Sequence, residues 1–229
     1  MDINEMEKQI ISTKGFKINA IMQALDMSLQ IFKRNYNEIS KLIKDFDFPL
    51  YNLMFWSEKN KHMRIEFQIE LYRTFVNFES ASASLIDHSR NFSKKDIKDG
   101  IKDKYAEKVK EYFADNGLAN FIKDFRNYLL HKEYPNIEIS TELSNNKNYI
   151  YFNKDELEIW DGWKSKSKIF LKEQDRNLSI EMLVDDYYKL VVEFYEWLFD
   201  ELRKEYKDEY EEVNTLIKRF NKTFFGTEI

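Results

Sequence analysis

The chain has no cysteine, only two prolines and only five glycines among its 229 residues. The absence of cysteine excludes disulfides, thiolate zinc sites, iron–sulfur clusters and a cysteine nucleophile. The shortage of glycine and proline favours long helices joined by few tight turns. No apolar run approaches the roughly 18 residues that a membrane-spanning helix needs, and the first residues lack the basic and apolar segments of a signal peptide. We therefore expect a cytoplasmic protein with no membrane partner.

A strong positive charge is also missing, since the formal net charge is −5. Proteins that coat nucleic acid without specificity are basic, so any chemistry on RNA would need a local site. Charge is nevertheless uneven along the chain. Residues 94–110 carry seven Lys against four Asp or Glu, whereas residues 196–212 carry eight Asp or Glu against three Lys or Arg. We interpret both stretches as solvent-exposed helix faces.

Apolar residues are plentiful: 43% of the chain is hydrophobic and 16% is aromatic. This is enough for a sizeable core in one domain over residues 1–229. The apolar side chains recur at the spacing of amphipathic helices, and Ser93 has the position of a helix N-cap. The predicted helices cover residues 16–46, 65–91, 93–113, 118–133, 179–206 and 209–224. Small residues at 80–84 would let another helix approach closely.

The spacing changes to strict alternation after Pro135. Residues 137–140 and 149–152 have the pattern of two β-strands joined by a polar turn, which predicts a hairpin. The predicted fold class is therefore mainly α: an up-and-down helical bundle with a small β-hairpin insertion at 135–155 and C-terminal helices over 179–225.

Two connecting stretches have weaker patterns. Residues 50–63 are rich in aromatic and apolar side chains, and we expect them to cover one end of the core. Residues 155–172 favour a short helix that includes Leu157, Trp160 and Trp163.

Residues 126–131, Arg-Asn-Tyr-Leu-Leu-His, carry the clearest chemical signal. A histidine titrates near neutral pH and can both take and give a proton. An arginine is a fixed cation with a fork of donors suited to phosphate. Arg126 and His131 together could cleave an RNA phosphodiester with no metal and no cofactor.

On a helical wheel these side chains do not share one line. Asn127 and His131 are neighbours one turn apart, whereas Arg126 and His131 are about 140° apart. Arg126 falls at the edge of the apolar face, where it would extend into solvent, pair with an acid or face a second helix. A second copy of the helix, related by a two-fold axis, would bring the two groups together. The predicted polar face consists of Lys123, Asp124, Asn127 and His131, with Tyr134 added if the helix continues that far.

The segment from Phe121 to His131 resembles the motif helix of HEPN domains. Arginine, a polar residue, three further residues and histidine match their Arg-X4–6-His pattern. HEPN domains are α-helical bundles, and many are metal-independent ribonucleases that act as toxins, defence effectors or RNA-processing enzymes. The resemblance is concentrated in this one helix. HEPN toxins that are regulated by tyrosine adenylylation often have His-X-Tyr, whereas Tyr134 lies one place later here.

The resemblance implies a homodimeric endoribonuclease in which a ribose 2′-OH attacks the adjacent phosphate, so RNA is cut and DNA is not. His131 would act as general acid or base, Arg126 would bind the scissile phosphate, and Asn127 would orient His131 or hold a phosphate oxygen. No metal or cofactor is expected. The implied setting is a toxin or an anti-phage effector with a cognate antitoxin or defence partner.

Two other functions fit the same sequence. One is a non-catalytic HEPN-like scaffold that recruits a protein or nucleotide partner. The other is a plain helical interaction module, with Arg126 in a salt bridge and His131 as a cation at a helix C-terminus.

Asp87, His88 and Arg90 could line the same cleft as Arg126.

Overall fold

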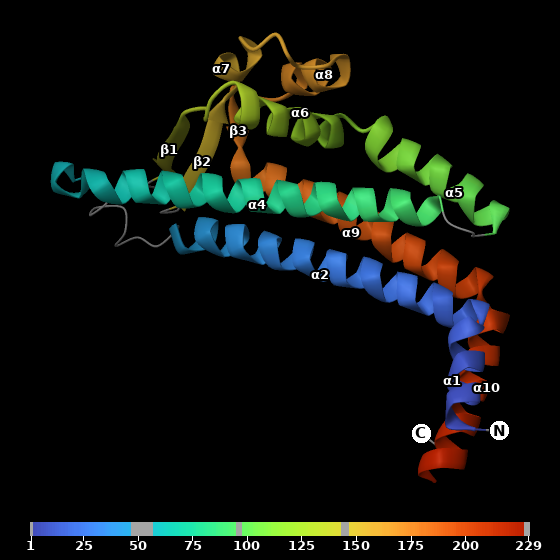
Figure 1. Ribbon diagram of the computed structural model, residues 1–229. Helices are drawn as coiled ribbons and strands as arrows, with labels where there is room; N and C mark the ends of the chain where they lie inside the picture. Colours follow the sequence, from blue (N-terminus) through green and yellow to red (C-terminus); the bar gives the residue numbers. More distant parts are fainter. Residues whose placement is uncertain (1, 47–56, 95–97, 143–146, 227–229) are drawn as a thin grey trace.

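The computed structural model describes residues 2–46, 57–94, 98–142 and 147–226. The protein is mainly helical and carries a small antiparallel sheet (Figure 1), which confirms the predicted fold class. None of the helices in these ranges combines the length and the apolar character needed to cross a membrane.

Three long helices form the body of the molecule (Figure 1): α2 (Lys14–Phe46), α4 (Lys61–Ser93) and α9 (Ile180–Glu205). Their apolar stripes meet in a common core, as the helical spacing predicts. Phe32 of α2 stacks on Phe78 of α4 and on Tyr188 of α9, with ring centroids 5.0 and 5.8 Å apart. A short 3₁₀ turn, Glu58–Asn60, leads into α4.

Two further pairs of elements surround this body. α5 (Asp99–Val109) continues into a π-helical turn, Lys110–Ala114, and is followed by α6 (Gly117–His131). The side chain of Asn116 caps α6 by accepting a hydrogen bond from Ala119 N at 3.0 Å. α1 (Ile3–Ser12) and α10 (Lys207–Phe225) pack together and extend beyond one end of the long helices (Figure 1).

The sheet contains the predicted hairpin and one strand more. β1 (Ile137–Glu142) pairs antiparallel with β2 (Lys147–Asn153), so that Ile137 lies opposite Phe152. β3 (Asn177–Ser179) pairs with the other edge of β2. A strand of three residues is too short to show an alternating pattern, and this is why the sequence did not reveal it.

Two boundaries differ from the predictions. Ser93 does not cap the third helix; it belongs to α4, where its hydroxyl donates to Arg90 O, and α5 begins only at Asp99. Residues 155–172 contain two helices, α7 (Lys154–Glu158) and α8 (Ser165–Glu173), joined by a loop.

Tertiary packing explains the second of these differences. Trp163 lies in the loop and not in a helix, and its indole donates to Leu157 O at 2.6 Å. Its ring stacks on Phe121 of α6, with centroids 5.2 Å apart. Half of the predicted covering segment at 50–63, residues 50–56, lies outside the described residues. Among the small residues of α4, Ser82 is buried and its hydroxyl lies 2.7 Å from that of Tyr187 on α9.

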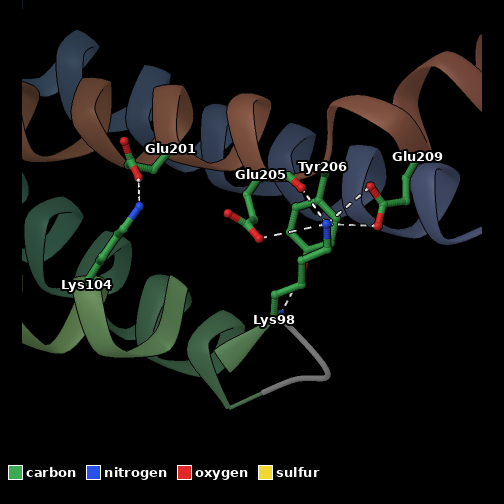
Figure 2. A network of polar contacts seen from close by, with 6 residues as sticks. All are labelled: Lys98, Lys104, Glu201, Glu205, Tyr206 and Glu209. Carbon is green, nitrogen blue, oxygen red and sulfur yellow. Dashed lines mark hydrogen bonds and ion pairs between the residues drawn. The ribbon is translucent and has the colours of Figure 1, made fainter. Parts of the chain in front are cut away.

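The basic and acidic stretches meet each other at the junction of α9 and α10 (Figure 2). Lys98 Nζ lies 3.1 Å from Glu209, and Lys104 Nζ lies 2.7 Å from Glu201. The hydroxyl of the fully buried Tyr206 accepts a hydrogen bond from Lys98 N at 2.9 Å. These side chains therefore tie the start of α5 to the C-terminal helices, in addition to facing solvent.

Candidate functional site

Helix α6 carries the Arg-Asn-X3-His run and is α-helical from Gly117 to His131. Its buried side is the one that the wheel predicts, and it includes Phe121, Ile122, Phe125 and Tyr128. Its exposed side chains are Lys123, Arg126, Leu130 and His131. By helix geometry these four fall in one sector of about 140°.

Asp124 does not lie on the exposed polar face of α6, where the helical wheel predicts it. It lies in the interior, with 2% of its surface exposed, because α8 covers this side of α6. Its carboxylate accepts hydrogen bonds from Lys164 N at 3.0 Å and from the Ser167 hydroxyl at 2.7 Å. The carboxylate is thus occupied in holding α8 against α6, and the surface of α6 that remains open is the sector from Arg126 to His131.

Arg126 pairs with an acid, which was one of its three expected environments. Its Nε lies 3.4 Å from Glu79 Oε2, while close to half of the Arg126 side chain stays exposed. Glu79 belongs to α4 and is only 5% exposed. Burial raises the pKa of Glu79 to about 7, although the positive charge of Arg126 acts in the opposite direction. Within the described part of the chain, no group donates a hydrogen bond to this carboxyl.

A pocket of about 380 Å³ opens beside this pair, between α4, α5 with its π-helical turn, and α6. Such a volume suits a small ligand or one unit of a polymer. Lys123, Arg126 and Asn127 line it from α6. The side chains of Lys123 and Asn127 make no ion pair or hydrogen bond with other described residues, so their donors are free for a ligand.

Two residues of α4 also reach this pocket, as the sequence suggested. Asp87 and Arg90 line it and form an ion pair of 3.3 Å. His88 does not line it: its Nδ1 lies 2.6 Å from the Ser28 hydroxyl on α2. His62 is exposed at the start of α4, away from the pocket.

His131 is the last residue of α6; it is exposed and does not line the pocket. Five residues of helix separate it from Arg126 by roughly 7.5 Å along the axis and about 140° around it. The structure therefore brings Arg126 and Asn127 to one pocket and leaves His131 beside it. A single chain does not direct Arg126 and His131 at the same point.

Glu79 is the pocket residue that sequence reasoning missed. A signal was present, because Glu79 lies one turn after Phe75 and three residues before Ser82, on the buried stripe of α4. An acid on a buried helix stripe is unusual and marks a buried charge that needs a partner.

Among the described residues, no group of three or more His, Asp or Glu side chains is placed to hold a metal ion. Comparisons of the chain with protein-family models, with curated proteins and with solved structures found no match. The family resemblance therefore rests on the residues of α6 alone.

Proposed function

We propose that the protein is a metal-independent endoribonuclease of the HEPN type that acts as a homodimer. The observation that carries this proposal is the exposed sector of α6, which presents Arg126, Asn127 and His131 beside a pocket with free donors. Arg126 would bind the scissile phosphate and stabilise the charge that develops on it. His131 would transfer a proton, and Asn127 would hold a phosphate oxygen.

The nucleophile in this proposal is the ribose 2′-OH. Its attack on the adjacent phosphorus displaces the 5′-oxygen and yields a 2′,3′-cyclic phosphate and a 5′-OH end. DNA lacks this hydroxyl and would remain intact. The setting that we propose is that of a cytoplasmic toxin or anti-phage effector, restrained or triggered by an antitoxin or a defence partner.

The position of His131 supports a dimeric site. Leu130 is 60% exposed and lies between Arg126 and His131 around the α6 axis. A second copy packed on this face would bury the Leu130 side chain. A two-fold axis through this face would bring His131 of one copy toward Arg126 of the other, and each site would then draw on both copies.

The test is incubation of the purified protein with RNA in excess EDTA. We expect cleavage to persist, and we expect Arg126→Ala and His131→Ala to abolish it. Arg203→Ala and His62→Ala are matched controls, because both change exposed residues away from the pocket. Loss of cleavage under chelation contradicts the metal-free mechanism, and full activity in both site variants contradicts the assignment.

The alternative is a non-catalytic binding protein, and two observations favour it: Arg126 already has an acidic partner, and His131 is outside the pocket. In that case the pocket would hold a nucleotide or part of a protein partner. Binding of RNA or nucleotide without any cleavage by the wild-type protein would identify this function.

A further inference from the structure

The carboxyl of Glu79 has no role in the mechanism given above, although it lies next to the group that would bind the phosphate. It lines the pocket while being 5% exposed, and it is 3.4 Å from Arg126 Nε. A phosphate bound by Arg126 would bring its neighbouring ribose to the same pocket. The 2′-oxygen of that ribose is the atom that must lose a proton.

The other charged and titratable groups around this pocket leave the Glu79 oxygens open. Lys123 comes from α6, while Asp87 and Arg90 of α4 pair with each other. The two tyrosines that face the pocket also have partners of their own. The hydroxyl of Tyr105 on α5 lies 2.9 Å from Ser89, and the hydroxyl of Tyr187 on α9 lies 2.7 Å from Ser82.

We infer that Glu79 is a second catalytic residue, the general base that removes the proton from the 2′-OH, while His131 is the general acid. This inference rests on the proposed ribonuclease function. The bond between the 2′-oxygen and phosphorus forms as the bond between phosphorus and the 5′-oxygen breaks. The proton of the 2′-OH passes to the Glu79 carboxylate, and the 5′-oxygen takes a proton from the His131 imidazolium. Proton exchange with water then restores both groups.

The assignment of Glu79 as general base and His131 as general acid follows from what a metal-free cleavage needs. One group must accept a proton and another must donate one in the same reaction, and a single histidine cannot do both at once. Burial raises the pKa of Glu79 to about 7, which makes this carboxylate a stronger base than an exposed one while about half of it is ionised at neutral pH. Arg126 stabilises the ionised form and keeps the carboxylate beside the phosphate.

The decisive experiment compares two substrates, an ordinary RNA linkage and one in which the 5′-bridging oxygen is replaced by sulfur. A sulfur leaving group departs without protonation, so it removes the need for the acid but not for the base. On ordinary RNA we expect Glu79→Gln and His131→Ala each to lower kcat by about 10²- to 10⁴-fold. On the sulfur substrate we expect His131→Ala to recover activity and Glu79→Gln to stay slow.

The pH profile of wild-type kcat/KM supplies a second measurement. We expect it to fall on the acidic side as Glu79 is protonated, and we expect this limb to be absent from Glu79→Gln. Glu70→Gln is the matched control, since Glu70 is an exposed residue of the same helix that pairs with Arg73. Circular dichroism of each variant verifies the fold.

Three outcomes would overturn the inference: full kcat in Glu79→Gln, recovery of Glu79→Gln on the sulfur substrate, or an increase in KM alone. Any of these with an active wild-type protein overturns only the role of Glu79. A wild-type protein that cleaves neither substrate contradicts the ribonuclease function itself.

Discussion

The ion pairs at the junction of α9 and α10 differ from the Arg126–Glu79 pair in the pocket in how the charges are held. At the junction of α9 and α10, the hydrogen bond from Lys104 holds the pKa of Glu201 below its usual value. In the pocket, Glu79 is buried with Arg126 Nε 3.4 Å away and with no hydrogen bond from the described residues, and burial raises its pKa to about 7. The ion pairs at the junction stabilise the charged side chains and, with them, the fold. The ionised form of the buried Glu79 carboxyl lowers the stability of the protein, as ionisable residues in functional sites often do.

The largest expected effect is on RNA cleavage, and it tests whether the pocket is part of a site shared between two copies. If each site combines Arg126 of one copy with His131 of the other, Arg126→Ala and His131→Ala are each inactive alone. Mixing the two variants with subunit exchange would produce heterodimers with one intact site, and would restore about a quarter of wild-type activity. RNA cleavage before and after mixing measures this. A mixture that stays inactive contradicts a site shared in this way.

The next effect concerns association through α6. Replacing Leu130 by Glu places a charge in the middle of the proposed two-fold interface, so we expect monomers and loss of cleavage, because charges are depleted from interface cores. Sedimentation velocity measures the oligomeric state. Ile159→Glu is the control, since Ile159 is 80% exposed in a different part of the surface. Equal behaviour of the two variants would place the interface elsewhere.

A smaller effect concerns stability and pH. Glu79 has a folded-state pKa near 7, above the unfolded value of 4.5, so its contribution to stability is present below pH 4.5 and is lost as pH rises through 7. Glu79→Gln removes this loss. We expect the free energy of unfolding of the variant, relative to wild type, to rise between pH 5 and pH 8 by up to about 3 kcal/mol.

Urea denaturation at the two pH values measures this difference. Glu70→Gln should show no such dependence, because Glu70 is exposed. A difference between Glu79→Gln and wild type that does not change with pH would show that Glu79 does not titrate in this range.

The smallest expected effect lies at the junction. Tyr206→Phe removes the hydroxyl that accepts from Lys98 N, and the loss of one such hydrogen bond costs about 1 kcal/mol. We expect a lower free energy of unfolding and unchanged cleavage of RNA. A large loss of activity in this variant would show that the junction also affects the pocket, and would contradict a purely structural role for the junction.

The sequence predicts the long helices and the hairpin well, because their periodicity is repeated over many residues. It fails where a tertiary contact decides. Trp163 sits in a loop because it stacks on Phe121, and Asp124 is buried because α8 covers it. No local pattern encodes either contact.

The candidate site divides in the same way. Arg126 and Asn127 could be placed on the exposed edge of α6 from spacing alone. Glu79 could not be joined to Arg126, because the two residues come from different helices and 47 positions of sequence separate them. What the sequence offered was only an acid on a buried stripe.

The π-helical turn Lys110–Ala114 forms part of one wall of the pocket, and the shape of this wall depends on the number of residues in the turn. Phe113 and Ala114 of this turn line the pocket, and the side chain of Asn120 donates to both of their carbonyls, at 3.0 and 3.2 Å. A π turn holds one residue more than an α turn, and such turns are frequent at functional sites. Deleting a single residue here would let α-helical bonding replace the π turn and would change which side chains of the turn face the pocket. The pocket can thus be reshaped by an insertion or deletion with no change in the residues that carry its chemistry.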